Sequence, residues 1–504
     1  MNPDRQDPLV KVPTGIPGFD VFSEGGLPEG RTTMISGTAG SGKTIFASQF
    51  LAEGIKQGDN GVFVTFEESP AMLRKNMRGF GWDIEQWETE NKWFFVDASP
   101  LDQNIPLISR EYDLDPLLSR LKYAVGRVNA KRVAMDSLGS VFSYVPDIAQ
   151  VRNLLFKLAQ VLREMEVTAI LTSERTTDYG KISRYGIEEF VADNVIIMRN
   201  ALLEERRRRT IEILKFRGVS HQHGEFPFTI LSERGIIVIP FSTDVLKRKS
   251  SSIRTTSGSQ DLDAMCGGGW FKGSIILVSG ATGTGKTLTA TEFVNGGIKN
   301  KEKCLLFAFE ESREQLLRNA KGWGIDYEQM EREGILKIVC RYPETMGLET
   351  HFVNMKKQID EWKPERVVID SISSLERVST PKAFREFLLT INSLLKEKGI
   401  TTLCTANTVN LVGSDIITQS NISTNTDLII LLRYVEVYGE IRRGLAVLKM
   451  RGSTHNKDIR EFLISDNGMR LGKPFRNVTG ILAGNPIYVD TDEIERLSDL
   501  LTDS

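Results

Sequence analysis

The fold is decided by the stretch SGTAGSGKT at residues 36–44, in which Gly37 to Thr44 fit the pattern G-x-x-x-x-G-K-[ST]. In loops of this kind the glycines let backbone N–H groups converge on phosphate oxygens. The lysine reaches the β- and γ-phosphates, and the final hydroxyl can ligate magnesium. The stretch therefore predicts a site for a nucleoside triphosphate and Mg²⁺, built from Gly37, Gly40, Gly42, Lys43 and Thr44.

The same pattern returns as SGATGTGKT at 279–287, an offset of 243 residues, and TFEES at 65–69 returns at that offset as AFEES. Further on, RVAMDS at 132–137 returns as RVVIDS at 366–371, an offset of 234. A long repeat in constant order indicates a duplicated domain. One inactive copy is the alternative, but both copies keep their chemical residues. The second predicted site consists of Gly280, Gly283, Gly285, Lys286 and Thr287.

Within each copy, strand-like apolar runs alternate with helical patterns, which indicates βαβ units. We predict an α/β protein with two tandem P-loop domains, each a mostly parallel, doubly wound sheet flanked by helices. The predicted domains span residues 1–241 and 257–486, joined by a serine-rich, basic linker at 242–256 and followed by a short acidic tail at 487–504.

Composition and charge exclude several classes of function. The formal net charge is -2, so the chain lacks the basic excess of a dedicated nucleic-acid binder, and we expect no nucleic-acid partner. No apolar run approaches the roughly 20 residues that span a bilayer, and the first residues lack a signal-peptide pattern. We therefore expect a cytoplasmic protein with no membrane partner.

Two aspartates follow strand-like runs at matching positions in the two copies. Asp136 ends RVAMD and Asp370 ends RVVID, where an aspartate that holds magnesium together with Thr44 or Thr287 is expected. The alternative is that each caps a helix beginning at Ser137 or Ser371. The similar spacing from the P-loop in both copies favours the metal role.

Two pairs of glutamates follow the strand after each P-loop helix: Glu67 with Glu68, and Glu310 with Glu311. One carboxylate of each pair could accept a proton from, or orient, the oxygen that attacks the γ-phosphate. Because consecutive strand residues face opposite sides, we expect the first glutamate of each pair to be the base and the second its neighbour. A solvated, charged strand end is the alternative.

Two cations alternate on a strand-like segment of each copy, Lys215 with Arg217 and Lys449 with Arg451. Side chains two residues apart in a strand share a face, so each pair could reach one phosphate cluster, even across a subunit interface. Surface ion pairs remain an equal alternative on spacing alone.

One difference separates the copies. When Asp193 is aligned with Asp427, Glu189 and Phe190 fall opposite Ser423 and Thr424. The second copy therefore offers hydroxyls that a γ-phosphate could modify. A serine- and threonine-rich turn is the alternative.

The sequence resembles the KaiC family, the tandem RecA-like ATPases of the cyanobacterial circadian clock. The resemblance is carried by GTAGSGKT with TFEES, by ERRRRTIEILKFRGVSH, by MCGGGWFKGSIILVSGATGTGKT, and by ISTNTD with LKMRGSTH. It implies a two-tiered hexamer that binds ATP and magnesium between subunits. Its first tier would hydrolyse ATP slowly, and its second would be an autokinase and autophosphatase.

The resemblance also implies roles for single residues. Ser423 and Thr424 match the phosphorylated pair, Glu310 matches the kinase base, and Glu67 the hydrolytic carboxylate. The groups that match cations approaching the phosphates from the adjacent subunit are Arg443, Lys449 and Arg451, with Lys215 and Arg217 as first-tier equivalents.

Partners follow from the same resemblance. Docking of KaiB on the first tier is implied, whereas the tail VDTDEIERLSDLLTDS is short and acidic, so we expect no control by KaiA. Asn425 also departs from the family's apolar residue without removing a hydroxyl. Two other functions stay open: a nucleic-acid-dependent ATPase of the RecA type, and a nucleotide-sensing scaffold without phosphotransfer.

Overall fold

The computed structural model describes residues 9–98, 114–139, 145, 147–182, 191–203, 205–240, 251–408, 426–476, 478–481 and 487–488. The chain divides into two compact units, residues 1–240 and 241–504. Strand β12 (Arg254–Thr255) pairs with β13 (Trp270–Phe271) in the second unit. These two residues therefore belong to that unit and not to the linker predicted at 242–256.

The first unit is built on one large sheet in which β8, β3, β7, β6, β4 and β5 run parallel and β9 to β11 add antiparallel strands at one edge. A short ribbon of β1 and β2 accompanies it. In sheet order the strands are β11 (Gly235–Val238), β10 (Glu225–Leu231), β9 (Arg206–Phe216), β8 (Asn194–Leu203), β3 (Thr32–Gly37), β7 (Thr168–Glu174), β6 (Ala130–Asp136), β4 (Asn60–Thr65) and β5 (Trp93–Asp97), and the ribbon is β1 (Lys11–Val12) and β2 (Leu27–Pro28).

The second unit has the same arrangement: β14 to β19 run parallel, and β20 to β22 add antiparallel strands at one edge. The two mostly parallel sheets confirm the predicted RecA-like fold class. In sheet order the strands are β16 (Leu336–Cys340), β15 (Cys304–Ala308), β17 (Arg366–Asp370), β18 (Thr401–Asn407), β14 (Ile275–Gly280), β19 (Leu428–Val437), β20 (Glu440–Met450), β21 (Arg460–Ser465) and β22 (Gly468–Pro474), and a ribbon pairs β23 (Val478–Thr479) with β24 (Ile487–Tyr488).

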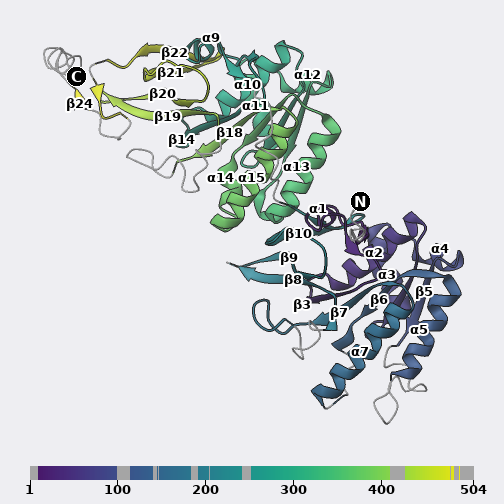
Figure 1. Ribbon diagram of the computed structural model, residues 1–504. Coiled ribbons are helices and arrows are strands. Elements are labelled where there is room, and N and C mark those ends of the chain that lie inside the picture. The colour runs from purple at the N-terminus through teal and green to yellow at the C-terminus, as the bar shows by residue number, and fades with distance from the viewer. Residues whose placement is uncertain are drawn as a thin grey trace, which may run out of the picture. The chain divides into compact units, whose positions relative to one another are not determined.

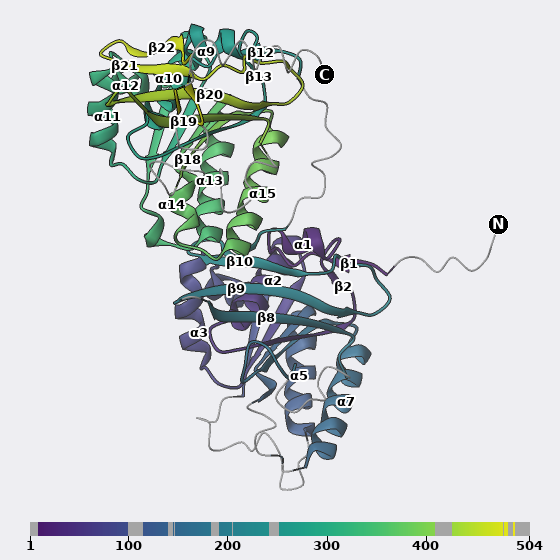
Figure 2. The same ribbon diagram turned by 90° about the vertical axis from the view of Figure 1, so that its left-hand side faces the viewer.

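Helices cover the sheets of both units (Figure 1, and turned in Figure 2). Local sequence explains where several of them begin: Ser69 precedes a proline and caps one helix, and Ser312 forms a capping box with Gln315 in the next copy. The helices are α1 (Phe19–Phe22), α2 (Lys43–Gln57), α3 (Pro70–Met77), η1 (Arg78–Phe80), α4 (Ile84–Thr89), α5 (Asp115–Val128) and α7 (Ile148–Glu164), then α9 (Gln260–Met265), α10 (Lys286–Lys299), α11 (Arg313–Gly322), α12 (Tyr327–Arg332), η3 (Pro343–Thr345), α13 (Leu348–Trp362), α14 (Ile372–Glu376) and α15 (Pro381–Glu397).

Alternation along β6 assigns the two faces of the first sheet. Val133 and Met135 are buried in one core with the apolar sides of α5 and α7. Arg132 precedes Val133 in the strand, so its side chain points to the opposite face. On that face Arg132 Nη1 donates to the Phe50 carbonyl of the P-loop helix α2 at 3.0 Å. Helix α2 therefore packs on the face opposite α5 and α7.

A buried arginine ties each P-loop helix to its sheet. Arg366 is 1% exposed, and it donates to the carbonyl of Phe293 in α10 at 2.8 Å and to Glu302 at 2.6 Å. A Cβ at Gly297 would lie 2.5 Å from the Arg366 Cδ, so the helix needs a glycine where the guanidinium stem passes. Arg132 repeats the arrangement in the first unit.

We expect Arg366→Leu to lower the free energy of unfolding of the second unit by about 3 kcal/mol, the low end of the cost of breaking a buried ion pair. The low end applies because Lys272 remains 2.9 Å from Glu302. The measurement is hydrogen exchange by mass spectrometry in increasing urea, read from peptides of the second unit. Arg318→Leu, at an exposed position of α11, is the control, and equal urea midpoints for the two variants would contradict the expectation.

Candidate functional site

Each P-loop connects the end of a central strand to the start of a helix. Strand β3 ends at Gly37 and α2 begins at Lys43, and β14 and α10 repeat this at Gly280 and Lys286. Gly285 caps α10 in a left-handed conformation with φ 108°, and a Cβ there would lie 2.4 Å from the Phe462 ring. Only glycine fits this turn, which aims the N-terminal N–H groups of the helix at the loop.

The P-loop lysines are buried and hold the loop in shape. Lys43 Nζ donates to the carbonyls of Gly37 at 3.0 Å and Thr38 at 3.2 Å, and Lys286 does the same with its own loop. Burial lowers the pKa of both lysines, and nearby carboxylates oppose that effect. A buried ammonium at a helix N-terminus is suited to bind an anion such as a phosphate.

The two aspartates, at the ends of β6 and β17, accept hydrogen bonds from the P-loop threonines. Thr44 Oγ1 donates to Asp136 Oδ2 at 2.6 Å, and Thr287 Oγ1 donates to Asp370 Oδ2 at 2.9 Å. Burial raises the pKa of both aspartates. The N-cap of α14 is Ser371, so Asp370 does not cap that helix as the alternative interpretation required.

The second oxygen of each aspartate accepts a hydrogen bond from a threonine hydroxyl that the sequence motifs did not predict. Thr172 in β7 donates to Asp136, and Thr405 in β18 donates to Asp370. The available signal was a threonine at the same place in the strand-like runs TAILTSE and TTLCTAN. Carboxylate and hydroxyl oxygens are the ligands that Mg²⁺ prefers, so Thr44 with Asp136 and Thr287 with Asp370 fit a magnesium–nucleotide complex.

The first glutamate of each pair is oriented by hydroxyls next to the aspartate. Ser137 Oγ donates to Glu67 Oε1 at 2.6 Å. In the second copy Glu310 Oε1 accepts from Ser371 and Ser374, both at 2.7 Å, and from Asn407 Nδ2 at 2.9 Å. The serine after the aspartate is present in both copies, and this repetition in the sequence could have identified it as a residue of the site.

The second glutamate of each pair bonds elsewhere. Glu68 Oε2 accepts from Asn76 at 2.9 Å, and Glu311 Oε2 accepts from Asn319 at 3.1 Å. The pKa of Glu311 is raised, mainly by burial and to a smaller extent by the negative charge of Asp370. The two glutamates of a pair therefore have different surroundings and can perform different tasks.

The alternating cations lie at the other end of the sheet from their own P-loop. Gly280 pairs with Leu432 of β19, and Lys449 of β20 pairs with Ile429 of the same strand. Ile429 precedes Leu432 by three residues, which corresponds to roughly 10 Å along the strand. There Lys449 Nζ donates to the Thr426 carbonyl at 2.8 Å. Arg451 lies 3.9 Å from Asp427.

The first copy has the same arrangement. Lys215 Nζ donates to the Ala192 carbonyl at 2.9 Å, and Arg217 lies 3.7 Å from Asp193. Gly37 is opposite Met198 of β8, and Lys215 is opposite Val195, three residues back. One copy of the fold thus does not bring these cations to its own P-loop.

Arg443 lies beside its own P-loop, unlike Lys449 and Arg451, with which the resemblance groups it. Its Nε donates to the carbonyl of Gly283 in its own P-loop at 3.2 Å. Arg209 makes the same bond to Gly40 at 3.1 Å in the first copy. Arg209 stands 234 residues before Arg443, so the repeat offset alone could have found it.

The predicted acceptors Ser423 and Thr424 lie outside the described residues, as do Glu189 and Phe190 opposite them. The nearest described residues are Thr426 and Asp427, at the end of the sheet where Lys449 and Arg451 lie.

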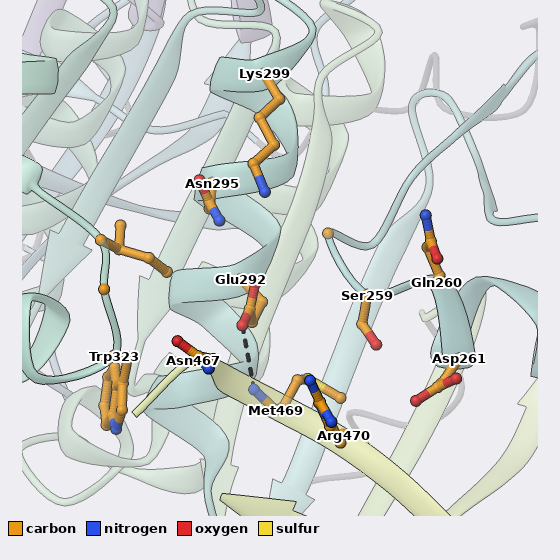
Figure 3. Close-up of a pocket in the computed structure, with 13 residues that line it drawn as sticks. Ser259, Gln260, Asp261, Glu292, Asn295, Lys299, Trp323, Asn467, Met469 and Arg470 are labelled. Atoms are coloured by element: carbon orange, nitrogen blue, oxygen red, sulfur yellow. Dashed lines mark hydrogen bonds between the residues drawn. The ribbon is translucent and has the colours of Figure 1, made fainter. Parts of the chain in front are cut away.

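A pocket of about 600 Å³ opens beside the P-loop helix of the second unit (Figure 3). Glu292 of α10 faces it, accepts from the Met469 N–H at 3.2 Å, and has a pKa raised by burial. In the first unit Gln49 stands at this position and bonds to the Gly15 carbonyl at 2.8 Å. Trp82 is buried there where the second copy has Ile325, so the two units differ at this flank of the P-loop helix.

Comparison with known proteins matches both halves of the chain to one family. A family model described as the KaiC ATPase matches residues 12–243 and again residues 255–475. The chain belongs to the KaiC family. Both halves are therefore ATPase domains of that family, which agrees with two sites that each combine a P-loop, a buried aspartate and a glutamate.

Related proteins cover nearly the whole chain. It is 64% identical over 494 residues to the circadian clock protein KaiC3 of Synechocystis, which covers 98% of each sequence. It is 49% identical to the circadian clock oscillator protein KaiC of Synechococcus elongatus, covering 99% of this chain and 96% of the relative. The protein of that name in Acaryochloris marina is also 49% identical, covering 98% and 95%. Among the helices described for this chain, none is long and apolar enough to cross a membrane.

We expect Gly285→Ala to weaken ATP binding by the second copy about tenfold or more, because strain at a left-handed position costs roughly 1–3 kcal/mol and the Phe462 ring must also move. The measurement is equilibrium binding of a fluorescent ATP analogue, analysed for two classes of site. Gly399→Ala is the matched control, since that residue also has a positive φ of 65° but no atom within 4 Å of the added Cβ. Unchanged affinity in the Gly285 variant would show that the turn tolerates a side chain.

Proposed function

We propose that this chain forms a homohexameric ring in which the first copies hydrolyse ATP. The second copies are the autokinase and autophosphatase of Ser423 and Thr424. Because relatives are named circadian clock proteins, we propose that the ring serves a clock or a related timing system. ATP and Mg²⁺ are the substrate and the metal of both copies.

The position of Lys449 and Arg451 carries this proposal. Both are at the end of the sheet away from their own P-loop, yet they recur in both copies as Lys215 and Arg217. A head-to-tail contact between identical subunits would bring this end of one subunit to the P-loop of the next. Contacts of this kind close into rings when the rotation permits.

The chain's own groups suggest how each copy would work. The P-loop lysine and the neighbour's two cations would bind the phosphates, and bound Mg²⁺ would neutralise charge on the β- and γ-phosphate oxygens. In the second copy Glu310 would accept the proton of a Ser423 or Thr424 hydroxyl of the neighbouring subunit while that oxygen bonds to the γ-phosphorus. The bond to the β–γ bridging oxygen breaks, and ADP leaves with its electron pair. Ser371, Ser374 and Asn407 would hold Glu310 in position for this step.

We expect Glu310→Gln to reduce transfer of labelled phosphate from ATP to the protein by about 10²–10⁴-fold, the usual contribution of a positioned base. Phosphosite mapping over time would locate the label at Ser423 and Thr424 in the unaltered chain. Glu333→Gln, at an exposed residue after α12, is the control. Labelling of the Glu310 variant at the normal rate would exclude this base, and labelling confined to other residues would exclude the acceptors.

Mixing two inactive variants tests whether the cations act on the neighbouring subunit. Glu310→Gln alters the P-loop side and Lys449→Ala alters the far end, so each alone should label poorly. In a randomly mixed ring about a quarter of the interfaces join an intact P-loop side to an intact cation end. Labelling should therefore recover to about a quarter of the level of the unaltered chain. No recovery in rings shown to exchange subunits would contradict action in trans.

The other functions make different predictions. A nucleotide-sensing scaffold would assemble with ATP but acquire no label, and a nucleic-acid-dependent ATPase would hydrolyse faster when DNA is added. Association with a KaiB-like protein, and the absence of stimulation by KaiA, belong to the same proposal and can be examined in the labelling assay by adding each protein.

A further inference from the structure

One position beside the P-loop is a carboxylate in the first copy and an amide in the second. Strand β7 ends with Glu174, which lies opposite Gly37, and β18 ends with Asn407, which lies opposite Gly280. Both residues therefore occupy the same place, at the carboxyl end of a strand directly next to the phosphate loop. One copy has a carboxylate there and the other an amide.

The amide of the second copy is used to orient the base. Asn407 Nδ2 donates to Glu310 Oε1 at 2.9 Å, and the Asn407 backbone N–H donates to Ser373 Oγ at 2.8 Å. A carboxylate has no N–H, so Glu174 cannot make the equivalent bond to Glu67. The exchange changes what this strand end can do in the site.

In the first copy Glu174 stands close to the same small space as Glu67. A Cβ at Gly139 would lie 3.9 Å from the Glu174 Cγ and 3.7 Å from the Ser137 Oγ, and Ser137 is the donor to Glu67. Lys43 is thus in the field of three carboxylates, those of Asp136, Glu174 and Glu67. Lys286 is in the field of Asp370 and Glu310.

We propose that Glu174 is a second acceptor that, with Glu67, holds the attacking water of the first copy, and that Asn407 makes the second copy favour a side-chain hydroxyl over water. The part that concerns Asn407 rests on the phosphotransfer function proposed above. The site thereby selects its nucleophile by the number of acceptors it presents.

The chemical reason is the number of hydrogens that each nucleophile carries. Water donates two hydrogen bonds, so two carboxylates can fix its orientation, whereas a serine or threonine hydroxyl donates one and needs one carboxylate. In the first copy the water oxygen bonds to the γ-phosphorus and the bond to the bridging oxygen breaks. ADP leaves with that electron pair, and one water proton passes to a carboxylate and then to solvent.

The test measures hydrolysis in the full-length Glu310→Gln chain, so that turnover belongs to the first copy. Adding Glu174→Gln should lower kcat about 10–100-fold, at or below the usual effect of a positioned acid or base, while KM changes less than about twofold. A merely structural role would raise KM or weaken assembly. Glu164→Gln, an exposed carboxylate at the end of α7, is the control. An unchanged kcat would overturn the role of Glu174.

The converse variant examines the second copy. Asn407→Glu, in the otherwise unaltered chain, should raise the ratio of free labelled phosphate to labelled protein, and an unchanged ratio would overturn the role of Asn407. If the unaltered chain acquires no label at all, the phosphotransfer function fails and the role of Asn407 fails with it. The Glu174 result is measured on hydrolysis alone and is decided separately.

Discussion

The hydrogen bonds that join each P-loop threonine to a buried aspartate set the geometry of both sites. A buried carboxylate is costly unless its oxygens are satisfied, and Asp136 and Asp370 each accept one hydroxyl from the P-loop helix and one from a neighbouring strand. The helix start is thereby held against two strands at once. The lysine, the glutamate and the phosphate loop all take their positions from this junction.

The duplicated copies keep that junction and diverge around it. Arg132 and Arg366 repeat, with the same bonds to the P-loop helix, because a change at a buried charge leaves its partner unpaired. Two positions near this junction differ between the copies: Gln49 corresponds to Glu292, and Glu174 corresponds to Asn407. Differences of this kind change the polar groups beside the P-loop and leave the shared frame unaltered.

Strand directions determine which end of the sheet the P-loop and the alternating cations occupy. The P-loop follows the carboxyl end of a central strand, and β20 runs antiparallel to its neighbour, so Lys449 and Arg451 arrive at the opposite end. There Lys449 donates to the Thr426 carbonyl, and Arg451 pairs with Asp427. The topology therefore separates these cations from the P-loop of their own copy, and in the proposed ring it would make catalysis depend on assembly.

The sequence by itself determined the duplication, the α/β class, both P-loops, the aspartates and the glutamate pairs. These are local patterns: a strand, a glycine loop and a helix start are adjacent in the chain, and the repeat confirms each of them. Thr172, Thr405, Ser374 and Asn407 were not predicted. Each is an ordinary polar residue whose importance depends on a partner between 35 and 97 residues away.

Tertiary structure alone decided which end of the sheet each cation occupies. Lys449, Arg451 and Arg443 lie close together in sequence, yet strand pairing places Arg443 at its own P-loop and the other two at the far end. Spacing in a strand tells which face a side chain shares, but not which end of the sheet lies near the phosphates. That requires the register between strands, which forms only when residues distant in the chain pair.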